Sequence, residues 1–90
     1  MTTVSREVRI TNIRGLHARA SAKFVTLASS HSAEVEVEKD GSKVAGTSIM
    51  GLMMLGAAKG DSIIISARGD GAEKALAALT ELVENKFGEE

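Results

Sequence analysis

"AEVEVEKDGSKVA", from Ala33 to Ala45, is the stretch that decides the fold. Its opening residues alternate apolar and acidic side chains, which is the period of two of a strand with one buried face. The Asp40-Gly41 pair that follows is a typical two-residue hairpin turn, so the chain is expected to return as a strand over Ser42–Ala45. The stretch therefore predicts an antiparallel sheet.

Two further strands are expected outside this hairpin. Val4–Ile10 alternates apolar and charged side chains, as a half-buried strand does. Asp61–Ala67 contains the consecutive isoleucines Ile63 to Ile65, and such an apolar run is typical of a strand buried on both faces. Between the first strand and the next element, Asn12–Gly15 is predicted to form a loop, because Gly15 tolerates backbone angles that other residues avoid.

Three segments have helical periodicity. The first begins at Ala18 and has an apolar stripe at Ala20, Phe24, Leu27 and Ala28. A short helix is predicted over about Ser48–Leu55, closed by Gly56. The last helix is expected to begin at the capping-box pair Asp70 and Glu73. The order βαββαβα predicts one α+β domain over residues 1–90, a four-stranded antiparallel sheet with its helices on one face.

The composition excludes several classes of protein. The 90 residues have a formal charge of −1 and only two aromatic residues, both phenylalanine, so a nucleic-acid surface is not expected. There is no cysteine, which rules out disulfides and thiolate chemistry. No apolar run is long enough for a membrane span, and no signal peptide is recognisable, so we expect a cytoplasmic protein.

His17 is the first candidate functional residue, because it lies at or just before the first turn of the first helix. The free backbone N–H groups at that end, such as those of Ala18 and Arg19, and the positive end of the helix dipole bind anions, phosphate in particular. They also disfavour a protonated imidazole, and a neutral imidazole nitrogen is a nucleophile. The Arg19 guanidinium adds charge-assisted donors. This arrangement predicts a histidine that accepts, holds and releases a phosphoryl group.

Other roles for His17 find less support in the residues. The ordinary alternative is an unreactive histidine in a surface loop. The Gly-Leu-His-Ala-Arg order ahead of an amphipathic helix favours a phosphoryl-accepting histidine instead. A metal site lacks ligands, because His31 is the only other histidine and lies at the far end of the same helix. A triad or a hydrolase lacks a partner group, since no acidic residue occurs between Asn12 and Ala33. A ferredoxin-like ligand-sensing or RNA-binding module needs aromatic or basic residues on the open sheet face, and the chain has almost none.

Two motifs resemble one known family over the whole chain. "GLHARASAKFV" is similar to the active-site stretch of HPr, the histidine-containing phosphocarrier of the bacterial phosphotransferase system. "KVAGTSIMGLMMLGAAKGD" is similar to the regulatory-serine region of that family. The resemblance implies an open-faced β-sandwich. It also implies that enzyme I phosphorylates His17 on Nδ1, using phosphoenolpyruvate, and that the group passes to A-type domains of enzyme II. Arg19 matches the active-site arginine.

The second motif adds regulatory and docking residues. Ser48 is expected to cap the short helix, and the resemblance makes it the target of a regulatory kinase in those bacteria that have one. That helix has too many apolar residues to bury, so an exposed patch is expected. By the resemblance, the patch docks onto enzyme I and the A-type acceptors; the expected interface residues are Ala22, Ile49, Met50 and Met53. We expect no cofactor and no metal, and a monomer.

The chain departs from the family pattern in two places. Ala20 replaces the usual proline after the arginine, which is expected to loosen the start of the helix slightly. Thr26 and Ser29 stand where many sugar-pathway members have lysines, and Lys23 remains. Weaker steering toward acidic partners follows, so a nitrogen-branch or regulatory phosphocarrier is the alternative to a sugar-uptake role.

Overall fold

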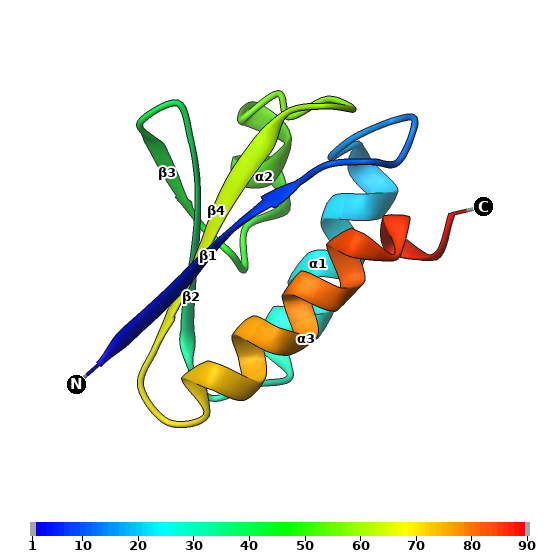
Figure 1. Ribbon diagram of the computed structural model, residues 1–90. Helices are drawn as coiled ribbons and strands as arrows, with labels where there is room; N and C mark the ends of the chain where they lie inside the picture. Colours follow the sequence, from blue (N-terminus) through cyan, green and yellow to red (C-terminus); the bar gives the residue numbers. More distant parts are fainter. Residues whose placement is uncertain (1, 90) are drawn as a thin grey trace.

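The computed structural model describes residues 2–89, and its elements follow the order βαββαβα before a final 3₁₀ turn (Figure 1). The strands are β1 (Thr3–Arg9), β2 (Glu34–Lys39), β3 (Ser42–Ala45) and β4 (Ser62–Arg68). The helices are α1 (Ala18–Ser29), α2 (Ile49–Met54) and α3 (Ala72–Glu84), with the turn η1 at Lys86–Gly88. The predicted α+β class and element order are confirmed.

The four strands form one sheet in the order β1-β4-β2-β3, and each neighbouring pair is antiparallel. The predicted hairpin between β2 and β3 is confirmed. Its two central residues, Asp40 and Gly41, have φ angles of 51° and 85°. Positive φ at both positions is the conformation whose twist matches that of the flanking strands.

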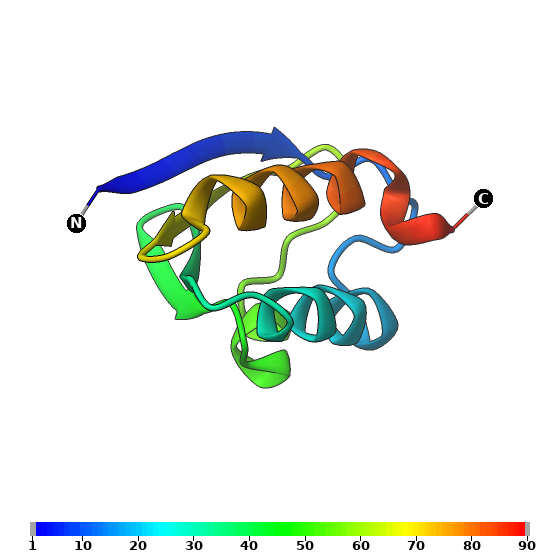
Figure 2. The ribbon, with the colours of Figure 1, turned by 90° about the horizontal axis from the view of Figure 1, so that it is seen from below.

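All three helices lie on one face of the sheet, and the other face is open (Figures 1 and 2). Helix α3 packs against β1 and β4, α2 adjoins β3, and α1 lies between α2 and α3. The core fills the space between the sheet and the helices; its largest buried side chains are Ile10, Phe24, Leu52, Ile63, Ile65, Leu79 and Phe87.

Two expectations are wrong, one about the burial of β4 and one about the cap of α3. Strand β4 is buried on one face only: Ile63 and Ile65 are 1% and 0% exposed, whereas Ile64 is 37% exposed on the open face. The run of isoleucines gave no sign of this, because period-two alternation needs a polar partner to be visible. Helix α3 begins from Gly71, whose φ is 73°, and no side chain caps it, so the capping box expected from Asp70 does not form.

The chain after α3 turns back toward the start of α1 (Figure 2). Lys86, Phe87 and Gly88 have φ angles of 57°, 57° and 75°, three successive left-handed residues of which only the last is glycine. Phe87 is 0% exposed, and its carbonyl oxygen accepts a hydrogen bond of 2.7 Å from Lys23 Nζ on α1. Burial of the phenyl ring and this bond hold a turn that would otherwise be unfavourable.

Candidate functional site

The loop before α1 places His17 at the helix N-cap, as the sequence predicts. Gly15 has a φ of 64°, and a Cβ atom at that position would lie 2.3 Å from the carbonyl oxygen of Ala57. The next residue, Leu16, donates its backbone N–H to the same oxygen at 2.9 Å. Glycine is therefore needed here both for the backbone angle and for clearance, and the loop is held against the chain that follows α2.

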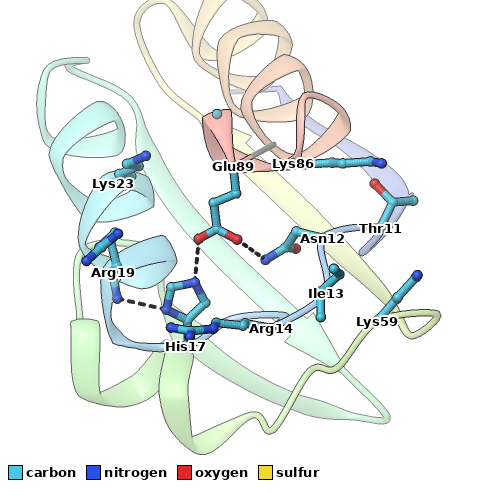
Figure 3. A pocket seen from close by; sticks show the side chains of 11 residues that line it. Thr11, Asn12, Ile13, Arg14, His17, Arg19, Lys23, Lys59, Lys86 and Glu89 are labelled. Carbon is cyan, nitrogen blue, oxygen red and sulfur yellow. Dashed lines mark hydrogen bonds and ion pairs between the residues drawn. The ribbon is translucent and has the colours of Figure 1, made fainter.

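The two imidazole nitrogens of His17 face different partners (Figure 3). Nδ1 accepts a hydrogen bond of 3.3 Å from the backbone N–H of Arg19, in the first turn of α1. Nε2 lies 2.5 Å from Oε2 of Glu89. A carboxylate only accepts hydrogen bonds, so Nε2 carries the proton and Nδ1 keeps its lone pair. The lone pair of His17 thus lies at the positive end of a helix.

Glu89 reaches His17 from the turn after α3, and Asn12 holds its second oxygen (Figure 3). Asn12 is 1% exposed, and its Nδ2 donates to the Gly15 carbonyl at 2.9 Å and to Glu89 Oε1 at 3.1 Å. The hydrogen bond from His17, and then the one from Asn12, lower the pKa of the Glu89 carboxyl from its ordinary value. Glu89 is therefore an ionised partner of the imidazole.

The surroundings of His17 are strongly basic although the whole chain has a formal charge of −1. A cavity of about 650 Å³ opens beside it, and five cationic side chains line this cavity: Arg14, Arg19, Lys23, Lys59 and Lys86. Helix α1 has no acidic residue in its first turn, so its own side chains leave the positive end of the dipole uncompensated. Such a cavity is suited to bind an anion next to Nδ1.

The other predicted residues lie on α1 and at α2, and these two helices pack against each other. Ser48 is the N-cap of α2, and its Oγ accepts a hydrogen bond of 2.9 Å from the backbone N–H of Gly51. The exposed patch expected on α2 is present: Ile49, Met50 and Met53 are 40%, 70% and 42% exposed, whereas Leu52 is buried. Ala22, on α1, is half-buried.

Several residues of the site escaped sequence reasoning. The interpretation that no carboxylate accompanies His17 is wrong, because Glu89 lies against it although the two are 72 positions apart. Two other large apolar side chains are exposed: Met54, at the end of α2, is 80% exposed, and Ile13, in the loop before α1, is 72% exposed. Phe87 was the one signal in the sequence that could have placed the residues after α3. A lone aromatic residue near a charged end is usually buried in the core, and Glu89 follows it closely.

Residues 2–89 contain neither a candidate metal site nor a helix suited to span a membrane. No group of three or more histidine, cysteine, aspartate or glutamate side chains in this range is arranged to hold a metal ion. In the same part of the chain, no helix combines the length and the apolar character needed to cross a membrane.

Comparisons with known proteins agree on one family. A family model described as the PTS HPr component phosphorylation site matches residues 4–85. The chain is 49% identical over 86 residues to the phosphocarrier protein HPr of Neisseria meningitidis, which covers 96% of this chain and 97% of that protein. It is 40% identical over 89 residues to the phosphocarrier protein NPr of Shewanella violacea, covering 99% and 98%.

A solved structure gives the same result for the fold. The crystal structure of HPr from Thermoanaerobacter tengcongensis superposes with a TM-score of 0.90 at 49% identity, covering 100% of this chain and 99% of that one. The matching family model, the full-length relatives and the shared architecture are mutually consistent. The chain therefore belongs to the HPr family of phosphocarrier proteins of the phosphotransferase system (PTS).

Proposed function

We propose that this protein carries a phosphoryl group on His17, accepting it from phosphorylated enzyme I and passing it to A-type domains of enzyme II. The observation that supports this most directly is the state of the imidazole. Nδ1 keeps its lone pair, faces the N-terminus of α1 and borders a cavity lined by five cations. A nucleophile placed beside an anion-binding site is what phosphoryl acceptance requires.

The proposed transfer needs positioning and charge stabilisation more than covalent help from the protein. Nδ1 attacks the phosphorus atom while the bond to the donor breaks, and the phosphoryl oxygens take over the Arg19 N–H that Nδ1 holds in the free protein. Within residues 2–89 the Arg19 guanidinium has no hydrogen-bond or ion-pair partner, and the side chain is exposed, so it is available to those oxygens. Transfer onward reverses the same steps.

The exposed apolar surface beside the site is proposed to dock both partners. Ile49, Met50 and Met53 project from α2, which packs on α1, and Ala22 is the expected contact from α1. Methionine side chains adapt to different surfaces, which suits a carrier that must meet a donor and several acceptors in turn. The five cations near His17 favour acidic partners and speed the encounter.

Ser48 is proposed as a regulatory phosphorylation site in a cell that has the corresponding kinase. The hydroxyl already sits where a helix N-terminus attracts negative charge, so a phosphate there would be tolerated by α2. It would also place about two negative charges next to Ile49 and Met50, on the surface proposed to meet an acidic partner. Phosphorylation is therefore expected to oppose docking without unfolding the protein.

A nitrogen-branch or regulatory carrier is the second candidate function. Lys23 is the one lysine on α1, and its amine is bound to the Phe87 carbonyl. Beyond the cations beside His17, α1 therefore adds no further lysine for steering, and the relatives include both an HPr and an NPr. Transfer rates to sugar-specific and nitrogen-specific A-type domains, measured side by side, would separate the two branches.

The test of the carrier role uses the two histidines as a matched pair. Wild type, His17→Ala and His31→Ala are incubated with enzyme I and phosphoenolpyruvate, and intact mass is recorded before and after mild acid. Wild type and His31→Ala are expected to gain one acid-labile phosphoryl group, and His17→Ala none. Full phosphorylation of His17→Ala would refute the site. No phosphorylation of wild type by its own organism's enzyme I would refute the carrier role.

A further inference from the structure

We propose that Glu89 is a positioning residue for His17: its carboxylate covers Nε2 and keeps the proton there, so that the phosphoryl group is accepted on Nδ1. This inference rests on the proposed function of His17 as phosphoryl acceptor. It deepens that proposal by assigning the choice between the two imidazole nitrogens to a side chain 72 positions away.

The turn that carries Glu89 is held in place by specific contacts. Lys86 and Phe87 both adopt left-handed backbone angles, which are unfavourable for L-residues. Phe87 is nevertheless fully buried, and its carbonyl accepts the 2.7 Å hydrogen bond from Lys23. Gly88 and Glu89 follow this anchor directly, so the carboxylate is tethered within two residues of a buried side chain.

The second carboxylate oxygen of Glu89 is also held, by Asn12. Asn12 is buried and uses its amide group for the Gly15 carbonyl and for Glu89 Oε1, while its own Oδ1 has no hydrogen-bond partner within residues 2–89. An unpaired buried oxygen is unfavourable. The orientation of the Asn12 amide is therefore maintained by the two hydrogen bonds that its nitrogen donates, to the Gly15 carbonyl and to Glu89 Oε1. One side chain thus ties together the loop before His17 and the carboxylate on His17.

Glu89 also supplies the charge that the reaction needs. The groups that face His17 across the cavity are the cations Arg14, Arg19, Lys23, Lys59 and Lys86, and Glu89 is the one acidic side chain that lines it among residues 2–89. When the Nδ1 lone pair forms the N–P bond, the electron pair of the broken bond leaves with the donor. Nε2 keeps its proton and the ring becomes a cation. The Glu89 carboxylate at Nε2 stabilises this imidazolium cation, whereas the five neighbouring cations destabilise it by like-charge repulsion.

The test reads the chemistry of the ring without any partner protein. Phosphoramidate, a small phosphoryl donor that reacts directly with imidazoles, is applied to wild type, Glu89→Ala and the control Glu84→Ala. Glu84 is exposed at the end of α3, so the control removes the same charge at a distance. All three proteins carry His31→Ala, which leaves His17 as the one imidazole. Phosphorus NMR then distinguishes the Nδ1 product from the Nε2 product.

Wild type and Glu84→Ala are expected to give the Nδ1 product. Glu89→Ala is expected to form the Nε2 product as well, and to form the Nδ1 product about 10-fold more slowly, the usual order for a lost positioning partner. An Nδ1 product alone from Glu89→Ala, an Nε2 product from wild type, or no reaction of wild type where free histidine reacts would each overturn the proposal. Glu89-dependent labelling without phosphorylation by enzyme I would refute the carrier role and leave the positioning role intact.

Discussion

Gly15→Ala is the substitution that tests how the loop before α1 is held. Two costs are expected at this position. The φ of 64° is left-handed, which costs an alanine roughly 1–2 kcal/mol. The added Cβ would also lie 2.3 Å from Ala57 O and 2.8 Å from Ala58 Cα, and both of these are backbone atoms that cannot rotate away.

The clash is expected to add a cost of its own, because relieving it separates the loop from the segment after α2. That movement breaks the hydrogen bond between Leu16 N and Ala57 O, whose residues are each 5% exposed. Leaving a buried amide and carbonyl without partners costs about 1–3 kcal/mol. Gly15→Ala should therefore destabilise the protein by about 3 kcal/mol in total, which is a large part of the stability of a domain of this size.

Gly56 provides a matched control. Its φ is 65°, and a Cβ there would meet nothing within 4 Å, so Gly56→Ala pays only for the backbone angle, about 1 kcal/mol. Urea unfolding followed by far-ultraviolet circular dichroism measures both variants, since the chain has no tryptophan or tyrosine for fluorescence. Gly15→Asn adds a second arm: asparagine accepts left-handed angles but still carries a Cβ, so it should be nearly as unstable as Gly15→Ala. Equal free energies of unfolding for Gly15→Ala and Gly56→Ala would refute the reasoning.

Two further predictions concern Ser48 and Glu89. Ser48→Asp keeps an N-cap but adds a charge, so it should weaken binding to enzyme I in calorimetry while Ser48→Asn, a neutral cap, binds like wild type; equal affinity of both would leave Ser48 as a cap alone. The pKa of Glu89 is lowered from 4.5 on folding, so its stabilising effect is complete above that pH and lost as the pH falls through the lower, folded-state value. The stability gap between wild type and Glu89→Gln, from urea unfolding at several pH values, should therefore shrink in acid; a gap that widens would contradict this.

Local patterns were sufficient for most of the fold and for the position of His17. The hairpin at Asp40-Gly41, the start of α1 at His17 and the cap of α2 at Ser48 each depend on a few neighbouring residues, and all three occur where the sequence predicts them. The exposure of Met50 also follows, because a six-residue helix has only one face to bury. Two local predictions failed. Three consecutive isoleucines in β4 gave no sign that Ile64 lies on the exposed face of the sheet. Asp70 does not cap α3, which begins from Gly71.

The sequence by itself determined that a histidine sits at the N-terminus of a helix, since helix caps and periodicity are properties of adjacent residues. It could not determine what covers the other nitrogen of that histidine. Glu89 reaches His17 because Phe87 is buried and because the turn after α3 adopts left-handed angles that no local preference suggests. Contacts between residues 72 positions apart depend on how the whole core packs, so only the tertiary structure decided which nitrogen is left free.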